Sequence, residues 1–306
     1  MKEAPANPPV LSPSFVADPA ALASLVRRLE GEPRVALDTE SNSFHAYRER
    51  VCLLQISIPG EDFIVDPLAV DVRPLGSVLG GERELVLHGA DYDVRCLRRE
   101  FGWDLGRIFD TMIAARRLGM RELGLAALVQ AQFGIRLSKE HQRADWGRRP
   151  LGREQVRYAA LDTHFLLPLH AILDASLSER GAAAEARREF DRIAAARAHE
   201  RVFDPEGWRK LKGARELDPA GKRALRALWL AREERASALD RPPFKVIPES
   251  SMVDLARLRP SDAAGMRAVP GVTPRVWEQA GEAIRSALES AAGGEGEGRR
   301  VLEAVS

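Results

Sequence analysis

Short apolar runs and helically spaced apolar residues alternate along the first half of the chain. Runs typical of buried strands occur in the segments VAL, VCLLQISI, DFIV and ELVL, at residues 35–37, 51–58, 62–65 and 84–87. Helical spacing predicts helices after Asp18-Pro19, from Asp91, from Asp110 and after the segment RPLGREQ. Strands that come first and are then interleaved with helices predict an α/β or α+β sheet domain.

The second half of the chain carries only helical patterns. Residues 181–201 are rich in alanine, arginine and glutamate, which is typical of a solvated connecting helix. From Asp218-Pro219 onward, capped starts and helical spacing predict a small all-helical domain. The chain is therefore divided into a disordered Pro-rich leader at 1–15, a sheet domain at 16–178, a helical connector at 179–214, a helical domain at 215–291 and a flexible tail at 292–306.

The composition limits the choice of partner and compartment. The chain has 46 Lys+Arg and 45 Asp+Glu, so its formal net charge is +1 and contacts with nucleic acid must come from local patches. Cys52 and Cys96 are too few for a disulfide framework and are typical of a reducing compartment. No signal peptide is recognisable, and no run reaches the roughly 20 apolar residues of a membrane helix. We expect a cytoplasmic protein without membrane contact.

Two acids, Asp38 and Glu40, follow the first apolar run with one residue between them. Side chains alternate along a strand, so these carboxylates point to the same side. They repel each other unless a cation lies between them, and hard divalent metals prefer such oxygen ligands. However, Asp204 and Glu206 repeat the spacing in a segment typical of a turn, and a chain with 45 acids contains such pairs by chance. The pair alone leaves both interpretations open.

A second pair of acids lies where a predicted strand leads into a helix, in LVLHGADYDVRCL. Asp91 is the better candidate for the helix cap, and Asp93 then lies in the first turn, beside the C-terminal end of the strand. We interpret Asp66 and Asp110 as strand-end or cap acids and not as metal ligands.

The segment RYAALDTHFLL predicts a helix that is apolar almost all round, yet Tyr158 and Asp162 share one of its faces. A buried Tyr–Asp hydrogen bond is one explanation. An ionised buried aspartate is costly without a cation, however, and the neighbouring side chains supply none. Carboxylates on a strand, a helix start and an apolar helix, taken together, predict a two-metal site for phosphodiester chemistry.

The segments LDTE, HGADYDVRCL and RYAALD follow one another in the order of three known exonuclease motifs. In this respect the chain resembles the DEDD superfamily, in the subclass that is marked by Tyr-x3-Asp, here Tyr158 and Asp162. The sister subclass has a histidine five residues before the last aspartate, where this chain has Arg157.

The resemblance is closer still to ribonuclease D. Between the second and third motifs that family has a stretch from Lys through Asp-Trp to Arg-Pro-Leu, which reads LSKEHQRADWGRRPLGREQ here. The helical region resembles the helicase-and-RNase-D C-terminal (HRDC) domain, so that the resemblance spans roughly residues 30–291. Ribonuclease D of enteric bacteria carries two such tail domains, whereas this chain has one.

The resemblance implies an RNase H-like exonuclease domain, with a mixed sheet flanked by helices, followed by one all-helical HRDC domain. It implies a monomeric 3′–5′ exoribonuclease that releases nucleoside 5′-monophosphates from the 3′ ends of transfer RNA or other structured RNA. In this family reading, Asp38, Glu40, Asp93 and Asp162 hold two Mg²⁺ or Mn²⁺ ions. Tyr158 orients the attacking water.

Further residues are candidates for nucleic-acid contacts. They are Phe44, His45, Lys139, Arg143, Trp146 and Arg149. The two that follow the first motif are predicted to line the pocket of the terminal nucleotide, and the basic ones beside the third motif to contact phosphates. Trp146 either stacks on a base or anchors its segment in the core. A basic sequence at 222–235 is either an auxiliary grip for nucleic acid or a solvated helix face.

Two other functions stay open. The same catalytic acids serve 3′–5′ deoxyribonucleases, and HRDC domains also occur in DNA helicases, so a DNA exonuclease in repair is the first alternative. The second is a non-catalytic module that binds nucleic acid. It ranks last because all four acids and the tyrosine are present.

Overall fold

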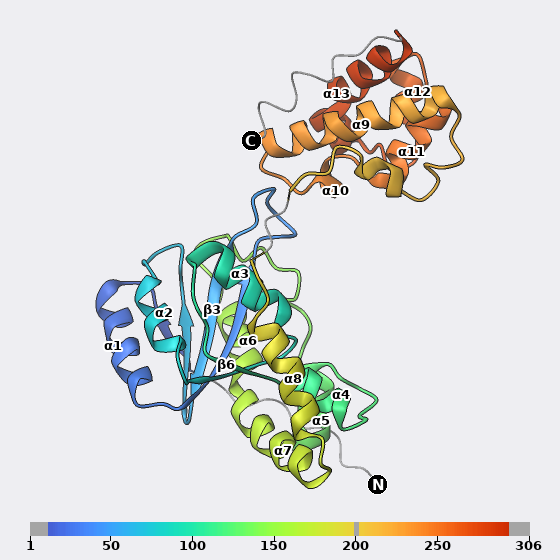
Figure 1. The fold of residues 1–306 in the computed structure, drawn as a ribbon. Helices are drawn as coiled ribbons and strands as arrows, with labels where there is room; N and C mark the ends of the chain where they lie inside the picture. The colour runs from blue at the N-terminus through green and yellow to red at the C-terminus, as the bar shows by residue number, and fades with distance from the viewer. Residues whose placement is uncertain (1–11, 199–201, 294–306) are drawn as a thin grey trace. The chain divides into compact units, whose positions relative to one another are not determined.

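The computed structural model describes residues 12–198 and 202–293, which form two compact units (Figure 1). The first unit contains the described residues up to Asn42 and those from Arg50 to 198. The second contains Ser43–Glu49 and the described residues from 202 onward. No helix within the described ranges is long and apolar enough to cross a membrane.

The first unit is built on one mixed sheet of six strands in the order β1-β4-β3-β2-β5-β6. The strands are β1 (Ser14–Val16), β2 (Arg34–Ser41), β3 (Val51–Ile58), β4 (Glu61–Val65), β5 (Glu84–Leu87) and β6 (Arg107–Asp110). β3 runs antiparallel to both β2 and β4, and the other neighbouring pairs are parallel. β3 and β4 form a hairpin, and Gly60 closes it with a φ of 82° that favours glycine.

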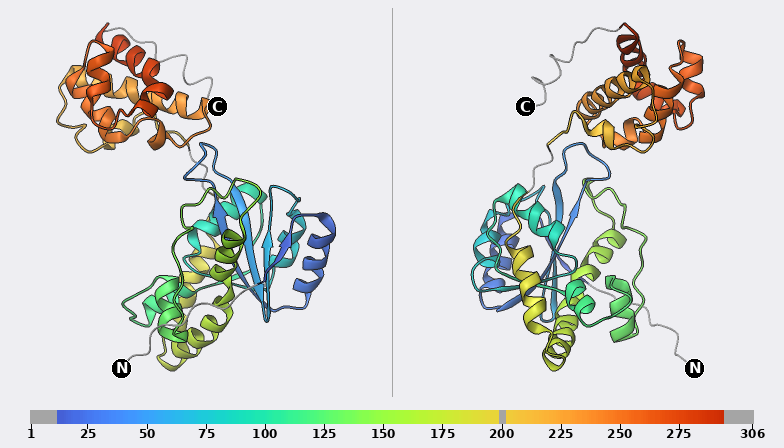
Figure 2. Two further views of the ribbon diagram at one scale, coloured as in Figure 1. Left: turned by 180° about the vertical axis from the view of Figure 1, so that it is seen from behind. Right: turned by 45° about the vertical axis from the view of Figure 1, so that its right-hand side comes forward.

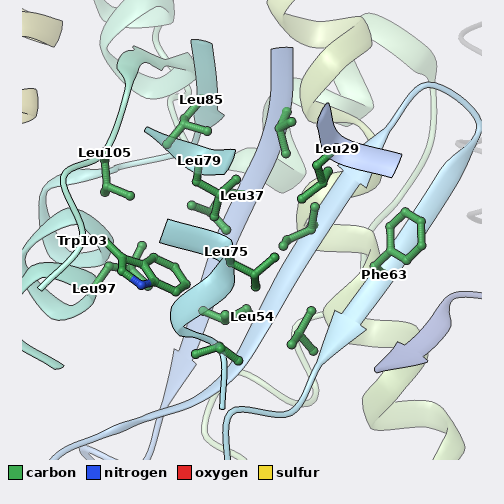
Figure 3. Close-up of a cluster of buried hydrophobic side chains, with 14 of the residues drawn as sticks. Leu29, Leu37, Leu54, Phe63, Leu75, Leu79, Leu85, Leu97, Trp103 and Leu105 are labelled. Atoms are coloured by element: carbon green, nitrogen blue, oxygen red, sulfur yellow. The ribbon is translucent and has the colours of Figure 1, made fainter. Parts of the chain in front are cut away.

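Helices cover both faces of this sheet (Figure 2). They are α1 (Pro19–Glu30), α2 (Arg73–Leu79), α3 (Asp91–Phe101), α4 (Thr111–Arg117), α5 (Leu125–Phe133), α6 (Arg153–His164), α7 (Leu166–Glu179) and α8 (Ala183–Ala194). Alternate strand residues such as Leu37 and Leu54 pack with α1, α2 and α3 on one face (Figure 3). Their neighbours Ala36 and Leu53 belong to the opposite face. The predicted fold class is confirmed.

The predicted solvated connector is wrong for α8. Phe190 is 2% exposed and packs against Phe109 of β6 in a tilted arrangement, with the ring centroids 4.9 Å apart. The buried carboxylate of Glu189 forms ion pairs with Arg116 and Arg117 of α4. One face of α8 therefore completes the core of the first unit, which continues past the predicted boundary at 178. Residues 199–201 lie outside the described residues.

The predicted leader also extends too far. Residues 1–11 lie outside the described residues, but Ser14–Val16 form β1 and pair in parallel with Phe63–Val65 of β4. Val16 is buried in the core. The prolines of this region obscured a strand of three residues, which owes its formation to backbone pairing with β4 and not to an apolar pattern of its own.

The second unit is helical and has its own core. Its elements are the 3₁₀ turn η1 (Gly207–Lys210) and the helices α9 (Pro219–Ala238), α10 (Pro243–Val246), α11 (Glu249–Leu258), α12 (Ala263–Ala268) and α13 (Pro274–Ala292). α9 and α13 pack along each other (Figure 1). The side chain of Thr273 caps α13 by accepting a hydrogen bond from the backbone N–H of Val276. Trp208 of η1 is buried in this core, so residues 207–210 are not part of a connector.

Substituting Phe190 by Ala should destabilise the protein by about 3–5 kcal/mol, because the ring fills a core site beside β6. Chemical denaturation monitored by circular dichroism measures this change. Arg188→Ala, on the exposed face of the same helix, is the control and should change the free energy of unfolding by less than about 0.5 kcal/mol. Equally small effects for both variants would instead support the interpretation of α8 as a solvated connecting helix.

Candidate active site

The central strand β2 brings two carboxylates to its C-terminal end. Asp38 and Glu40 lie on the strand face that is opposite to Leu37, the face against which α6 packs. In the register with β3, Asp38 is opposite Gln55, and a bulge between Glu40 and Ser41 ends the regular pairing. The strand therefore fixes both acids next to a helix while its backbone remains paired.

A third carboxylate, that of Asp93, comes from the first turn of α3. It is 5% exposed, and the hydroxyl of Thr39 donates a hydrogen bond of 2.5 Å to its Oδ1. The prediction that Asp91 caps this helix is wrong: α3 starts at Asp91 itself, which instead forms an i,i+4 ion pair with Arg95. Ala90 is the N-cap residue and has no side chain that could accept a hydrogen bond.

Nearby Asp110 is also buried, but its oxygens have other partners. They accept hydrogen bonds from the backbone N–H groups of Gly89 and Ala90, just before α3, and of Met112 and Ile113 in α4. One carboxylate thus joins the starts of two helices, as expected for a cap acid. This contact also fixes the backbone that leads to Asp93.

The remaining candidates, Tyr158 and Asp162, lie one turn apart on α6. Ala159 and Ala160 of this helix pack in a cluster with Leu53 of β3, which holds the helix against the sheet. The ring of Tyr158 lies edge-on to His141, with centroids 5.5 Å apart, and stacks with Trp146 at 6.2 Å. The side chain of Gln142 hydrogen-bonds to its hydroxyl.

The carboxylates are close enough for the charge of Asp93 to raise the pKa of the other three, while Asp110 raises that of Asp93. Burial is the largest cause in every case, and it raises the pKa of Glu40 to about 9 and those of Asp93 and Asp162 to about 7. The pKa of Asp38 is raised well above its usual value by burial and then by Asp93, Asp162 and Glu40. Burial and the same negative charges also raise the pKa of Tyr158, so its phenol stays protonated at neutral pH.

No basic side chain offsets these charges: none of the four acids forms an ion pair with a described residue. The amide of Gln55, opposite Asp38, is likewise buried, and neither its Oε1 nor its Nε2 has a hydrogen-bond partner in the described part of the chain. An all-oxygen donor set that is buried and anionic fits a hard divalent cation. Within the described residues, no three acid, His or Cys side chains already meet in a closed metal cage.

Two of the predicted nucleic-acid contacts are structural residues. Trp146 is 1% exposed, so it anchors its segment and does not stack on a base. Arg149 binds both carboxylate oxygens of Asp66, at 2.5 and 2.7 Å, and the carbonyl oxygen of Cys52 at 2.8 Å. This ion pair ties the loop before α6 to the sheet, so the prediction of a phosphate contact for Arg149 is wrong.

The other predicted contacts lie elsewhere. Lys139 and Arg143 are exposed in the segment before Trp146, where a phosphate contact stays a prediction. Phe44 and His45 belong to the second unit, in which the ring of Phe44 lies edge-on to Phe244 with centroids 6.5 Å apart.

Part of the basic sequence on α9 is also engaged within the second unit. Arg226 pairs with Glu206, and Arg235 donates to the carbonyl oxygen of Gln279. Arg232 is buried over the ring of Trp229. For these three arginines the grip for nucleic acid is not supported.

Three polar residues beside the acids were not singled out from the sequence: Thr39, Gln55 and Gln142. Thr39 lies between the two acids of LDTE, but strand alternation places it on the opposite face and gives no reason to pair it with Asp93. Gln55 interrupts the apolar run VCLLQISI, which is a signal that could have been used. The contact of Gln142 with Tyr158 depends on loop geometry, for which the sequence offers no pattern.

Comparison with known proteins places both units. Residues 13–178 match a family described as 3′-5′ exonuclease, and residues 222–288 match the HRDC domain. Ribonuclease D of Pseudomonas paraeruginosa is 33% identical over 282 residues, which cover 91% of this chain and 74% of that protein. The exosome complex component 10 homolog of Caenorhabditis elegans is 31% identical over 88% of this chain, which spans only 32% of that longer protein.

Solved structures agree with these relatives. The catalytic core of RRP6 from Trypanosoma brucei has a TM-score of 0.83 at 29% identity, and the match covers 96% of this chain and 83% of that one. RNase D of Escherichia coli, described as an exoribonuclease involved in structured RNA processing, has a TM-score of 0.71 at 27% identity, with 92% and 76% of the two chains covered.

Replacing Asp162 by Asn should stabilise the metal-free protein at pH 8. Its pKa is raised to about 7 in the folded state, so the folded state loses stability as pH rises from the unfolded pKa near 4 through 7. The advantage of the variant should therefore grow by about 2 kcal/mol between pH 5 and pH 8. Thermal or urea unfolding in EDTA measures it.

The control for this experiment is Asp174→Asn, at an exposed position on α7, which should show no such pH-dependent gain. Added Mn²⁺ should stabilise the unaltered protein more than the Asp162 variant. A variant that is less stable than the unaltered protein in EDTA at pH 8 would contradict the repulsion among the acids.

Proposed function

We propose a specific chemistry for this chain, which belongs to the ribonuclease D family of 3′–5′ exonucleases: stepwise hydrolysis from the 3′ end of structured RNA, with two Mg²⁺ or Mn²⁺ ions. The family establishes a hydrolase that acts on RNA and depends on divalent metal. We propose three further points: the number and identity of the ions, the residues that hold them, and attack from the 3′ end of this chain's own substrate.

One observation carries the assignment of the site. Four carboxylates from β2, α3 and α6 lie within reach of one another's charge, without a described cationic partner. Asp93 is buried, the other three are half-buried, and a tyrosine lies one helical turn from the last of them. A buried ion costs several kcal/mol unless it is compensated. Side chains that serve only the fold are not arranged in this way, whereas a cation-binding site requires it.

The proposed roles follow from position and charge. Asp38, Glu40, Asp93 and Asp162 hold the ions, and Thr39 keeps the carboxylate of Asp93 in place. When bound, such ions supply a more acidic water nucleophile and stabilise the charge on the leaving 3′ oxygen.

Tyr158 completes the proposed site. Because its pKa is raised, it remains a neutral phenol that cannot act as the base, and it orients the attacking water through its hydroxyl. The hydrogen bond from Gln142 restricts the direction of that hydroxyl.

Transfer RNA or another structured RNA remains the proposed target. Its support is the ribonuclease D relatives and the described role of the Escherichia coli structure in structured RNA processing. A monomer in the cytoplasm is part of the same proposal, consistent with two free buried cysteines. A DNA exonuclease is the competing function, because the four acids do not distinguish a ribose with a 2′-hydroxyl from a deoxyribose.

Matched single-stranded RNA and DNA oligonucleotides separate these functions. With Mn²⁺ we expect the 5′-labelled RNA to be shortened from its 3′ end faster than the DNA, with release of 5′-monophosphates. Asp162→Asn should lower the rate by at least about 100-fold, because it removes a negative ligand, whereas Asp174→Asn should leave it unchanged. Faster degradation of DNA would favour the repair exonuclease, and an active Asp162 variant would overturn the assigned site.

Substitution of Tyr158 by Phe should lower kcat by roughly 100-fold and leave KM nearly unchanged, because the phenol orients the water and does not hold the metal. Stabilisation by Mn²⁺ in thermal unfolding should be retained. Tyr47→Phe is a matched control, since it also removes a hydrogen-bonded hydroxyl, to Glu233 in the second unit. Unchanged turnover in the Tyr158 variant would remove the proposed role of the phenol.

A further inference from the structure

A groove with a volume of about 560 Å³ lies beside the first turn of α6. Its apolar lining includes Phe15 of β1, Leu151 and Val156. Phe15 is 44% exposed, which is unusual for a phenylalanine on a strand that belongs to the main sheet. An aromatic ring is thus available to solvent in a concave site.

The polar lining of this groove is entirely basic. Arg149, Arg153 and Arg157 line it, and no acidic residue does so among the described residues. Arg149 is neutralised by Asp66, as shown above, so its charge is not offered to a ligand. Arg153 is exposed and Arg157 is half-buried. An apolar floor with basic side chains at its rim suits an anionic chain that carries flat apolar groups.

Arg157 lies between this groove and the part of the proposed active site that contains Tyr158. This arginine also lines a neighbouring pocket of about 490 Å³, and Tyr158 lines that pocket as well. Arg153 precedes Tyr158 by five residues, which corresponds to a rise of about 7.5 Å along the helix. A nucleic-acid strand whose 3′ end lies at Tyr158 therefore reaches the groove only with nucleotides upstream of the terminal one.

We propose that this groove, defined by Phe15, Leu151, Arg153, Val156 and Arg157, binds the single-stranded RNA that lies upstream of the scissile bond. A base stacks on Phe15, and the phosphate beside it contacts Arg153. The inference rests on the proposed exonuclease function and extends it with a second binding surface outside the acid cluster.

Single-stranded nucleic acid fits these observations better than other anionic partners. Grooves for single strands combine basic side chains with aromatic rings, because every base has a flat face and every linkage a charge. An acidic peptide would need hydrogen-bond donors in the groove for its backbone carbonyls. It also lacks the regularly spaced flat groups that could stack on Phe15. Stacking of one base and contact with one phosphate predict a modest gain in affinity and no effect on the chemical step.

Two substrates of different length provide the test on the full chain. A 12-nucleotide RNA can occupy the groove, whereas a diribonucleotide is too short to leave the pocket at Tyr158. Phe15→Ala should raise KM for the 12-mer by about tenfold, and Phe15→Trp should retain the low KM because it keeps a stacking ring. Neither substitution should alter kcat or the rate on the diribonucleotide.

Arg153→Ala should raise KM for the 12-mer by a few-fold and reduce the slope of log affinity against log salt by about 0.7, as expected for one phosphate on a single strand. Arg121→Ala, an exposed arginine between α4 and α5, is the matched control and should change neither. Thermal unfolding of each variant shows that β1 and α6 remain folded.

Different results have different meanings. If Phe15→Ala and Arg153→Ala behave like the unaltered protein on the 12-mer, the groove does not bind RNA, and the proposed function stands without it. If both variants lower the rate of hydrolysis of the diribonucleotide as much as that of the 12-mer, the substitutions disturb the active site itself. The inference is then overturned. If the unaltered protein degrades neither RNA, the proposed function fails, and this inference fails with it.

Discussion

The structure depends on one costly arrangement: four carboxylates held together in a largely buried space at the end of β2. Burial raises the pKa of each of them, and repulsion within the group raises it further for Asp38, Glu40 and Asp162. The fold opposes this repulsion with rigid supports. Asp38 and Glu40 are fixed by the pairing of β2 on both edges, Asp93 by Thr39, and Asp162 by the helix face that packs on β3. These supports hold the acids at a spacing that their charges alone would widen.

Buried acids in this unit fall into two groups, and the difference lies in their partners. Asp110 accepts four backbone N–H groups and Asp66 binds a guanidinium, so each contributes to the fold with its charge compensated. Asp93 has one hydroxyl partner and Asp162 has no ion pair among the described residues. The lack of a compensating partner, and not burial itself, therefore separates the acids proposed to serve chemistry from the acids that serve structure.

The sequence pointed to the residues of the candidate site where an acid conflicts with the local apolar pattern. An aspartate on the apolar helix α6 and two acids after a buried run stand out because burial makes them expensive. Arg149 and Trp146 could not be separated from nucleic-acid contacts, because an arginine that binds Asp66 across the fold looks the same in sequence as one that faces solvent. For α8, the exposed alanines and arginines concealed a single buried stripe that contains Phe190. Its partner surface on β6 becomes visible only in three dimensions.

Charge that is counted along the chain overstates the charge that RNA can reach. The net charge is only +1, and arginines such as Arg149 and Arg232 are engaged in ion pairs or over aromatic rings. The acid cluster itself repels phosphate until cations compensate it, so attraction of the strand has to come from basic side chains beside the cluster. The first turns of α6 meet this requirement, because one helix carries Tyr158 and Asp162 on one face and Arg153 and Arg157 at the edge of a groove. The helix that completes the anionic centre thus also carries the cationic groups that allow a polyanion to approach it.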